Sequence, residues 1–372
     1  MFSLMPLDDV AALAPRWRDL ERRADPPACL AWPWIGAWLR RLPADARPHL
    51  LEIRAGASTL GLAVLTPSVA RRHGWLKVRQ WRLHEAGIPP LDALAIEDNG
   101  ILLDQSCPPS LLSACFRWLA ASLPQLDELV LSSVPMPLAE VAQAGLAGAG
   151  LACRLVRDDL RRFVDLDEVR AKGGYLSTLG SATRQAIRRA RRLYEGHGPL
   201  HLRAAASVEQ AWCFLDRMKP LHEARWQHKG EAGAFALPDF VPFHRDLIAA
   251  AWGEGGVELL ELTAGARLVG YLYNLRRRGW VHNYQGGFAY SADAREKPGL
   301  VCHHAAIVRA AAMGERFYDL MAGDSRYKAN LARRTDRLVT LAAAAPRPAL
   351  RAEQALRSLK ALLHRPTPAP VA

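Results

Sequence analysis

A dense group of polar side chains follows an apolar segment near the end of the chain. The segment ends at Gly323, and four functional side chains follow within five residues: Asp324, Arg326, Tyr327 and Lys328. Asp324 could accept a proton, Tyr327 could lose or donate one, and Lys328 could hold an anion. A turn capped by Asp324 would explain the glycine and the acid but not the Tyr-Lys pair, so this group is a candidate site.

A second group of functional side chains ends a predicted helix over residues 207–228. His222 and Glu223 are candidate bases, and Arg225 and Trp226 are candidate substrate contacts. An aromatic segment follows, as expected for the wall of a pocket. The alternative is a capped and packed helix end, which each residue taken singly would favour.

Two further segments have the chemistry to bind an anion. The predicted helix over 182–195, with Ser181 as its N-cap, carries arginines on one face and no acid before its last residue; these are Arg184, Arg188, Arg191 and Arg192. A solvated surface helix is the alternative. The second segment is Lys297-Pro298-Gly299-Leu300, which opens a predicted helix, so that its free amides and its lysine could cradle a phosphate.

An internal repeat indicates how these groups are positioned. Residues 50–62 and 259–271 are identical at seven of thirteen positions, and each reads as two apolar runs around Ala-Gly-Ala, the pattern of a β-hairpin. Each copy is followed by a strand, a helix and a further strand: 78–84, 110–122 and 128–131 after the first, and 280–285, 300–313 and 317–321 after the second. The sequence therefore predicts two tandem β-β-β-α-β units.

Charge and composition restrict the class of protein. With 50% hydrophobic and 23% charged residues, the chain has enough apolar residues for a large core. Its net charge of +12 falls entirely in residues 151–372, which contain 35 basic and 22 acidic side chains. A basic half favours an anionic partner, although the scarcity of lysine beside arginine also fits a biased codon supply.

The cysteines and the N-terminus carry weaker signals. The six cysteines are widely spaced and no Cys/His cluster has the spacing of a metal site, so we expect buried reduced thiols and no metal. The N-terminus lacks a basic region before an apolar run, and no segment approaches 18 apolar residues. These features predict a soluble cytoplasmic protein.

Several common catalytic motifs are missing from the sequence. It contains no nucleophile elbow, Walker loop or H-E-x-x-H motif, and Gly286-Gly287 is too short for a dinucleotide fingerprint. These absences favour a group-transfer enzyme whose donor arrives already activated.

The order of the motifs resembles the CelD/BcsL-type branch of the GNAT acyltransferase superfamily, which is related to FemAB-like proteins with two tandem GNAT-like units. The resemblance covers roughly residues 165–335 and rests on these segments: 175–190, Leu221–Trp226, Gly270–Asn274, Tyr284–Phe288, and Tyr318-Asp319 with Gly323-Asp324 and Tyr327-Lys328.

The resemblance implies a fold and a different role for each of the two units. Each unit is expected to be an α/β (α+β) domain with a mixed, mostly antiparallel sheet flanked by helices. We expect a degenerate GNAT-like domain without a CoA site in 1–160, a GNAT-like acyltransferase domain in 165–345, and a loosely packed, Pro-rich tail in 346–372. The acidic loop Ile96–Gly100 of the first unit is expected to line the acceptor cleft.

The resemblance also assigns roles to residues. It implies acetyl-CoA or another acyl-CoA as co-substrate, with its pyrophosphate at the helix start that includes Lys297, Gly299, Leu300 and Val301, and an oxyanion donor near Tyr284 and Gln285. His222, Glu223 or Asp324 would be the base, and Tyr327 would protonate the leaving thiolate. Substrate contacts would come from Arg184, Arg188, Arg225, Trp226 and Lys328. The Gly-rich pyrophosphate loop typical of GNAT enzymes is not intact here.

Two alternatives remain beside an acyltransferase that acts on a carbohydrate, lipid or amino-sugar acceptor, in exopolysaccharide or cell-envelope synthesis. One is a non-catalytic protein whose arginine helix binds RNA or an anionic membrane. The other is a FemAB-like transferase that uses aminoacyl-tRNA, although no heptad run predicts the coiled-coil arm common in such proteins.

Overall fold

The computed structural model describes residues 1–94 and 96–363 of the 372-residue chain. The first part of the chain contains, in order, β1 (Phe2–Pro6), α1 (Val10–Ala24), α2 (Trp32–Leu39), β2 (His49–Ala55), β3 (Ser58–Arg72), β4 (Leu76–Leu83), α3 (Pro89–Asp92), β5 (Leu102–Leu103), α4 (Pro109–Ser122), β6 (Glu128–Pro135), α5 (Met136–Ala147) and β7 (Ala152–Asp165).

The second part contains α6 (Leu166–Ala171), α7 (Ser181–Glu195), β8 (Leu200–Ala204), α8 (Val208–His228), α9 (Phe240–Ala251), β9 (Val257–Ala264), β10 (Arg267–Arg277), β11 (Trp280–Phe288), α10 (Pro298–Ala312), β12 (Phe317–Ala322), α11 (Arg326–Leu331), β13 (Arg334–Ala344) and α12 (Pro348–Leu363). Short 3-10 turns lie at Ala28–Leu30, Tyr175–Thr178, Ala234–Ala236 and Trp252–Glu254.

The strands form one mixed sheet. The strands of the first unit follow one another from one edge, and the corresponding strands of the second unit follow in the same order from the other edge. The order is β1-β2-β3-β4-β6-β13-β7-β12-β11-β10-β9-β8, with β5 paired to β3. Strands β1 to β4 have their counterparts in β8 to β11, and β6 and β7 have theirs in β12 and β13; β5 has no counterpart. Among the described strands, β4 with β6 and β11 with β12 are parallel, and the other pairs are antiparallel. The predicted fold class, two tandem GNAT-like α/β units, is confirmed.

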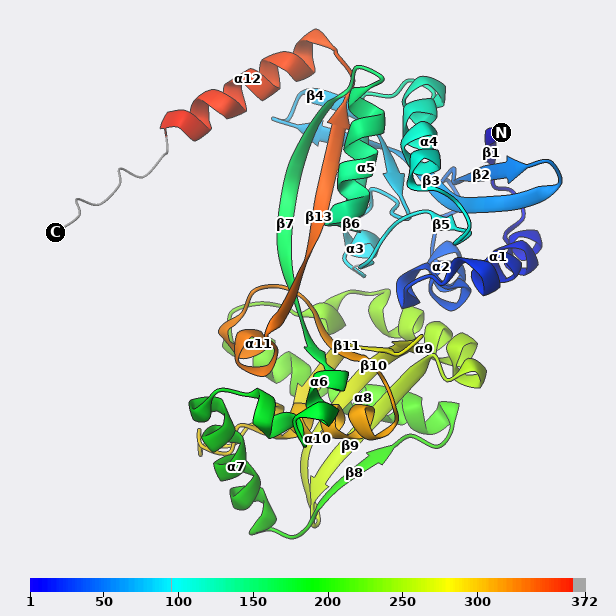
Figure 1. Cartoon of the computed structure of the whole chain (residues 1–372). Coiled ribbons are helices and arrows are strands. Elements are labelled where there is room, and N and C mark those ends of the chain that lie inside the picture. The colour runs from blue at the N-terminus through cyan, green and yellow to red at the C-terminus, as the bar shows by residue number, and fades with distance from the viewer. Residues whose placement is uncertain (95, 364–372) are drawn as a thin grey trace.

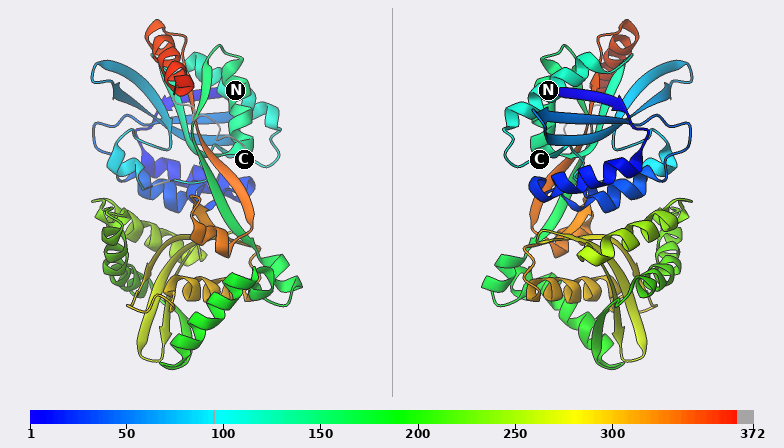
Figure 2. Two further views of the ribbon diagram at one scale, coloured as in Figure 1. Left: turned by 90° about the vertical axis from the view of Figure 1, so that its left-hand side faces the viewer. Right: turned by 90° about the vertical axis from the view of Figure 1, so that its right-hand side faces the viewer.

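The two units exchange their last strands. β13, from the end of the chain, pairs with β6 of the first unit, and β7 pairs with β12 of the second. The long strands β7 and β13 also pair with each other from Ala152 to Phe163, and both cross between the halves of the molecule (Figures 1 and 2). The predicted boundary at residues 160–165 therefore falls inside a strand that belongs to the sheet of both units.

Helices cover both faces of the sheet. One face is covered by a core that is common to both units, in which α1 and α2 of the first unit lie beside α8 and α9 of the second. Trp34 on α2 packs against Phe243 and Tyr284, with ring centroids 5.0 and 5.6 Å apart. The other face has two separate cores, one under α4 and α5 and one under α7 and α10. Among the residues that the structure describes, this aromatic packing between the units lies on the face of the common core.

The repeated hairpins form as the sequence predicts. β2 and β3 are joined by Gly56-Ala57, and β9 and β10 by Gly265-Ala266. The two glycines have φ angles of 59° and 57°, the left-handed conformation that two-residue hairpin turns require. A larger residue would be strained at either position, which explains why glycine recurs in the two turns.

Most predicted helices are confirmed, with differences at their ends. Ser207 caps α8 by accepting a hydrogen bond from Gln210 N, as predicted. The prediction that Ser181 caps α7 is wrong, because Gly180 has the extended backbone of the cap and Ser181 is the first helical residue. Among the described residues, no helix has the length and apolar content needed to cross a membrane.

The prediction that all six cysteines are buried is only half correct. Cys29, Cys115 and Cys302 are buried, whereas the other three are partly exposed, and all six are free thiols. At the other end of the chain, the predicted tail begins with α12, which projects from the body (Figure 1) and packs Leu350 against Leu76 and Val78. Residues 364–372 of that predicted tail lie outside the described residues.

Candidate active site

The parallel strands β11 and β12 separate after a short stretch of pairing. Three residue pairs join them, and the last is His282 with Asp319. β11 runs on to Phe288, and a β-bulge in its pairing with β10 makes Tyr284 an extra residue. Because β12 does not follow, this edge of β11 has backbone groups that a substrate can use. Bulges are common beside active sites, so this split is the first element of the candidate site.

His282, at the closed end of the split, is held by a carboxylate. Its Nδ1 lies 2.8 Å from Oδ2 of Asp319, and both side chains are almost fully buried. Burial would lower the pKa of His282, but the hydrogen bond and charge of Asp319, with the charge of Asp98, outweigh burial and raise the pKa. The contact occupies Nδ1 and leaves Nε2 as the atom that can take a proton from a substrate.

The first unit inserts a carboxylate beside this pair. Glu97 accepts a hydrogen bond from Ala322 N at the end of β12, with distances of 3.0 and 3.1 Å to its two oxygens. Lys328 donates to the carbonyls of Met321 and Ala322, at 3.1 and 2.6 Å. Burial, and then the charge of Asp319, raise the pKa of Glu97 to about 7, whereas burial lowers the pKa of Lys328. Glu97 therefore gains or loses its proton near neutral pH.

An arginine neutralises the carboxylates between the units. Ligand atoms of Asp98, His282 and Asp319 lie within 4.8 Å of one another. However, Nη1 of Arg161 lies 2.5 Å from Asp98 and 3.9 Å from Asp319, and Nη2 lies 2.8 Å from Asp336. The guanidinium already supplies the positive charge that a metal ion would bring, so we describe these side chains as an ion-pair cluster.

The first unit has different residues at the corresponding positions. β4 and β6 are also paired in parallel at three positions, and the last pair is Arg82 with Val130. This pair corresponds in register to His282 and Asp319. The histidine and carboxylate therefore occur in the second unit alone, although the strands are arranged in the same way.

The hydroxyl of Tyr327 is buried next to the start of α10. It has no hydrogen-bond partner among the described residues, and a Cβ on Gly299 would lie 2.9 Å from it. The ring of Phe288, at the end of β11, lies 3.3 Å from the same Cβ position. Burial raises the pKa of Tyr327 well above its ordinary value, so the hydroxyl is protonated at neutral pH and can donate a proton.

The other predicted bases lie in different surroundings. Asp324 is 60% exposed and pairs with Arg162 at 3.0 Å. His222 is buried against Phe235, with Nδ1 3.4 Å from Gly286 O and with Nε2 unpartnered. Burial lowers the pKa of His222. Glu223 lies 3.8 Å from Lys219 on the same helix. The hydrogen bonds and ion pairs of these three residues do not connect them with one another.

A large groove lies at the far end of β11. It has a volume of about 720 Å³ and lies between the last turns of α8, the end of β11 and the loop before α10. Its walls are mainly apolar, with Leu221, Phe288 and Pro298 among them, and Arg225 and Lys297 supply positive charge. The guanidinium of Arg225 lies over the ring of Tyr290, 4.9 Å from its centroid. The groove can therefore hold a long, partly apolar ligand with an anionic end.

The start of α10 offers fewer free amides than the sequence predicts. Leu300 N and Val301 N lie 3.0 and 3.4 Å from the carbonyl of Lys297, and Pro298 has no N–H. This leaves Gly299 N as the free amide of the first turn. Gly299, Leu300 and Val301 are all buried, so the exposed Lys297 is the residue of this segment that can reach a ligand in the groove.

The side chains of Tyr284 and Gln285, the residues predicted to lie near the oxyanion, have different partners. The hydroxyl of Tyr284 donates to Leu94 O of the first unit at 2.5 Å, and its ring packs against His244 and Tyr273. Gln285 accepts from Gly286 N through Oε1 at 3.4 Å. Tyr284 thus contributes its side chain to the contact between the units.

The predicted substrate contacts also differ in accessibility. Arg184 donates to Leu179 O at 3.2 Å, whereas Arg188 is exposed on α7. The ring of Trp226 lies 4.3 Å from Lys229 Nζ. Lys328 is engaged by the two carbonyls of β12. Arg188 and Arg225 are therefore the members of this set whose guanidinium groups are most open to a ligand.

The candidates from the sequence did not include three residues at the centre of the site, His282, Asp319 and Arg161, and they included Glu97 only as part of the loop Ile96–Gly100. Asp319 interrupts the otherwise apolar strand β12. A polar residue inside such a strand is a signal that could have identified Asp319, because a buried charge requires a partner.

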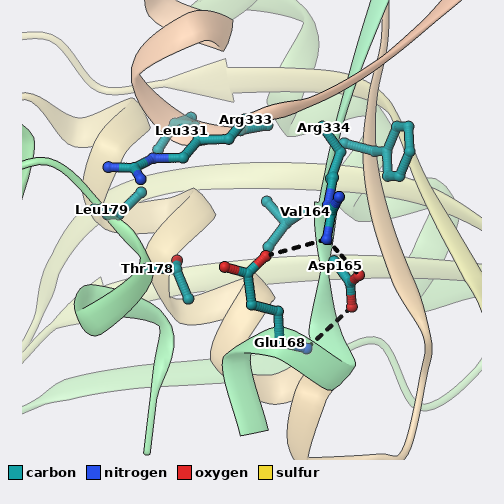
Figure 3. A pocket seen from close by; sticks show the side chains of 10 residues that line it. Val164, Asp165, Glu168, Thr178, Leu179, Leu331, Arg333 and Arg334 are labelled. Carbon is teal, nitrogen blue, oxygen red and sulfur yellow. Dashed lines mark hydrogen bonds and ion pairs between the residues drawn. The ribbon is translucent and has the colours of Figure 1, made fainter. Parts of the chain in front are cut away.

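A smaller hollow beside β13 can be excluded as a substrate site. It holds about 20 Å³, and its walls include Thr178 and Leu179. Figure 3 shows Arg334 directed towards Asp165 and Glu168, at 3.7 and 3.8 Å. A volume of this size admits a single water molecule.

Comparison with known proteins identifies a domain type in the second unit. Residues 181–329 match the family described as acetyltransferase (GNAT) domain. This match includes α7 to α11 and therefore the whole of the split and the groove. No curated protein matches the sequence.

Solved structures with a similar fold cover nearly the whole chain. The crystal structure of FemX has a TM-score of 0.59 at 9% identity, covering 93% of this chain and 99% of that one. The C-terminal domain of a putative lysylphosphatidylglycerol synthetase from Agrobacterium fabrum has a TM-score of 0.54 at 15% identity, covering 95% and 96%. L-PGS from Bacillus licheniformis has a TM-score of 0.53 at 11% identity, covering 90% and 92%. At these identities the likeness concerns the fold alone.

Proposed function

We propose that the protein is an acyltransferase that moves an acetyl or longer acyl group from an activated donor to an amine or hydroxyl acceptor. The observation that carries this proposal is the split between β11 and β12, with the bulge at Tyr284 on its open edge and the His282–Asp319 pair at its closed end. The GNAT acetyltransferase match of residues 181–329 supports it, because that segment supplies all these elements.

Acyl-CoA is the proposed donor, bound in the groove beside α8 and α10. The apolar walls suit the pantetheine arm, and Lys297 and Arg225 suit the phosphates. The single free amide of Gly299 makes side chains, rather than a backbone cradle, the main phosphate contacts. This arrangement agrees with the absence of an intact Gly-rich loop from the sequence.

The proposed reaction uses groups at both ends of the split. Nε2 of His282 takes the proton of the acceptor amine or hydroxyl, while Asp319 stabilises the imidazolium. The acceptor atom bonds to the thioester carbonyl carbon, and a backbone amide at Tyr284–Gln285 stabilises the oxyanion. The carbon–sulfur bond then breaks, and Tyr327 donates its proton to the thiolate. If Tyr327→Phe keeps the turnover of the wild type, Tyr327 is not the group that protonates the thiolate.

The first unit is proposed to bind no donor. Arg82 and Val130 stand where the second unit has its histidine and carboxylate. Its acidic loop is also directed to the other unit, since Glu97 contacts Ala322 and Asp98 contacts Arg161. The loop Ile96–Gly100 is therefore proposed to form part of the acceptor cleft.

The acceptor is proposed to be a carbohydrate, a lipid or an amino sugar. The CelD/BcsL-type order of motifs in residues 165–335 supports a carbohydrate, lipid or amino-sugar acceptor in exopolysaccharide or envelope synthesis. The cytoplasm is the proposed location, because acyl-CoA is available there.

A second candidate donor is aminoacyl-tRNA. One residue of α7 lies close enough to the groove to influence it: the pKa of Asp293, a groove residue, is lowered to about 2, mainly by Arg295 and also by the charge of Arg189 of α7. Arg191 pairs with Glu195, but Arg188 and Arg192 are exposed. Such a surface could bind the backbone of a tRNA acceptor stem. The same arginines would serve a non-catalytic protein that binds RNA or an anionic membrane.

Calorimetric titration with acetyl-CoA and longer acyl-CoAs tests the donor. We expect micromolar binding that Lys297→Ala and Arg225→Ala each weaken about tenfold, the typical effect of losing one charge-assisted contact. Lys77→Ala, at an exposed lysine of the first unit, should bind like the wild type. Free CoA measures how much of the affinity comes from the acyl group.

The same titrations separate the alternatives. If no CoA binds, and if aminoacyl-tRNA binds in a way that depends on Arg188 and Arg192, the donor is aminoacyl-tRNA and not acyl-CoA. Salt-sensitive binding of RNA or anionic vesicles, with no transfer to any acceptor and no effect of His282→Gln, would favour the non-catalytic role.

A further inference from the structure

A cavity with both apolar and charged side chains in its walls lies between the two units on the side of the His282–Asp319 pair. It has a volume of about 420 Å³. The first unit contributes the link between α1 and α2, from Asp25 to Leu30, and the loop that contains Asp98. The second unit contributes the turn between β10 and β11 and the start of β11 with Trp280 and His282, and Arg161 comes from the exchanged strand β7. The cavity is thus separate from the donor groove, which lies at the other end of β11.

Positive charge predominates in the walls of this cavity. Four arginines line it, Arg161, Arg277, Arg278 and Arg316, against two carboxylates, Asp25 and Asp98. Three of the arginines have acidic partners. Arg161 pairs with Asp98 and Asp336, Arg277 pairs with Glu21 at 3.0 Å, and Arg278 pairs with Asp25.

One arginine in the walls remains without an acidic partner. Arg316 is exposed and, among the described residues, forms no hydrogen bond or ion pair through its side chain. Its guanidinium lies 5.3 Å from the ring of Phe317. The charge of Arg316 is therefore available to an anionic ligand in the cavity.

We propose that this cavity binds the acceptor substrate, and that the acceptor is a small molecule with a carboxylate or phosphate group. The guanidinium group of Arg316 binds the anionic oxygens, because a guanidinium group matches both oxyanions in charge and in geometry. This inference rests on the proposed function in one respect: His282 is taken as the base that receives the acceptor proton.

The positions of two aromatic side chains support an acceptor in this place. The rings of Trp280 and His282 are stacked, with an interplanar angle of 11°, and both line the cavity. His282 also forms the last pair of β11 with β12, two residues before the bulge at Tyr284. A nucleophile that approaches Nε2 from this cavity would therefore reach the closed end of the split, while the donor reaches the split from the groove. The volume suits a metabolite of sugar-phosphate size.

Titration with inorganic phosphate and with acetate tests the proposal and distinguishes the two anions. The wild type should bind at least one of them saturably, and Arg316→Gln should weaken that binding about tenfold. Arg316→Lys should recover part of the affinity, because the charge is kept and the planar fork is lost. Arg71→Gln, at an exposed arginine on β3, is the matched control and should leave binding unchanged.

The results also separate this inference from the proposed function. Lys297→Ala should weaken acyl-CoA binding but leave phosphate or acetate binding at the cavity unchanged. Arg316-dependent anion binding without any donor binding would keep the cavity as an anion site and overturn the acyl transfer. Donor binding with no saturable anion binding, or anion binding that Arg316→Gln does not weaken, would overturn the inference and leave the proposed function intact.

Discussion

The proton affinity of His282 depends on its burial and on the charged groups around it. Asp319 holds Nδ1 of His282 and raises its pKa against the effect of burial. A base must be unprotonated to act, so the transfer rate should rise with pH through a pKa above 6.5. Asp319→Asn removes the raising contact, and we expect the rising limb of kcat/KM to move to lower pH.

The value of kcat tests whether His282 is the base. His282→Gln should lower kcat about a hundredfold or more while donor binding stays unchanged, because general-base catalysis contributes roughly that much. Arg82→Gln, at the corresponding position of the first unit, should leave kcat near the wild-type value. A His282→Gln variant with wild-type kcat would contradict the assignment.

Glu97 gives a prediction about stability. Its pKa is raised from 4.5 to about 7, first by burial and then by Asp319, so the native state binds its proton more tightly than the unfolded state does. The stabilisation is complete below pH 4.5 and is lost as the pH rises through 7. Relative to Glu97→Gln, the wild type should therefore lose up to about 3 kcal/mol of unfolding free energy between pH 4.5 and 8. Denaturant unfolding of both proteins across this range measures the difference, and a constant difference would show that Glu97 has an ordinary pKa.

The residues of the site were only partly accessible from the sequence. Tyr327 and Lys297 could be proposed, because each stands at the end of an element that the periodic pattern predicts, whereas the backbone of Tyr284–Gln285 was implied by the family resemblance. Glu97 and Arg161 could not, because they meet Ala322 and Asp319 only after the chain has crossed between the units. Such contacts depend on tertiary structure, to which a local pattern is insensitive.

At the scale of elements, the packing of α8 against β11 shapes the donor groove. A Cβ at Gly287 would lie 2.7 Å from the carbonyl oxygen of Met218 and 2.8 Å from its Cγ. We expect Gly287→Ala to push α8 from the sheet and to destabilise the protein by about 1–3 kcal/mol. Gly253→Ala, where an added Cβ would meet nothing within 4 Å, is the control and should be nearly neutral. Equal thermal stability of the two variants would contradict this packing.

The predicted elements were most accurate where hydrophobic periodicity and turn residues agree. The hairpins and α10 formed close to the expected positions, because glycine or proline fixes their ends. The lengths of β7 and β13 were not predicted. Both strands are rich in arginine and partly exposed, so their pairing with each other, rather than an apolar pattern, determines their extent.

At the scale of the molecule, the exchange of β7 and β13 makes the units interdependent. A fragment of residues 166–345 lacks β7, so β12 and β13 both lose a partner strand, and the core that α8 and α9 share with α2 is also opened. We expect this fragment to be unfolded or aggregated, and a fragment that begins before Ala152 to be more ordered. Circular dichroism and unfolding curves of the two fragments test this. Cooperative unfolding of the shorter fragment would mean that the second unit is an independent domain.

The most direct test of the account is a crystal structure of the protein with a non-hydrolysable thioether analogue of acetyl-CoA. The account predicts density along the groove beside Lys297 and Arg225, with the carbonyl oxygen within hydrogen-bond distance of a backbone amide at Tyr284–Gln285. Density at the corresponding strands β4 and β6 of the first unit, or nowhere near the split between β11 and β12, would contradict it.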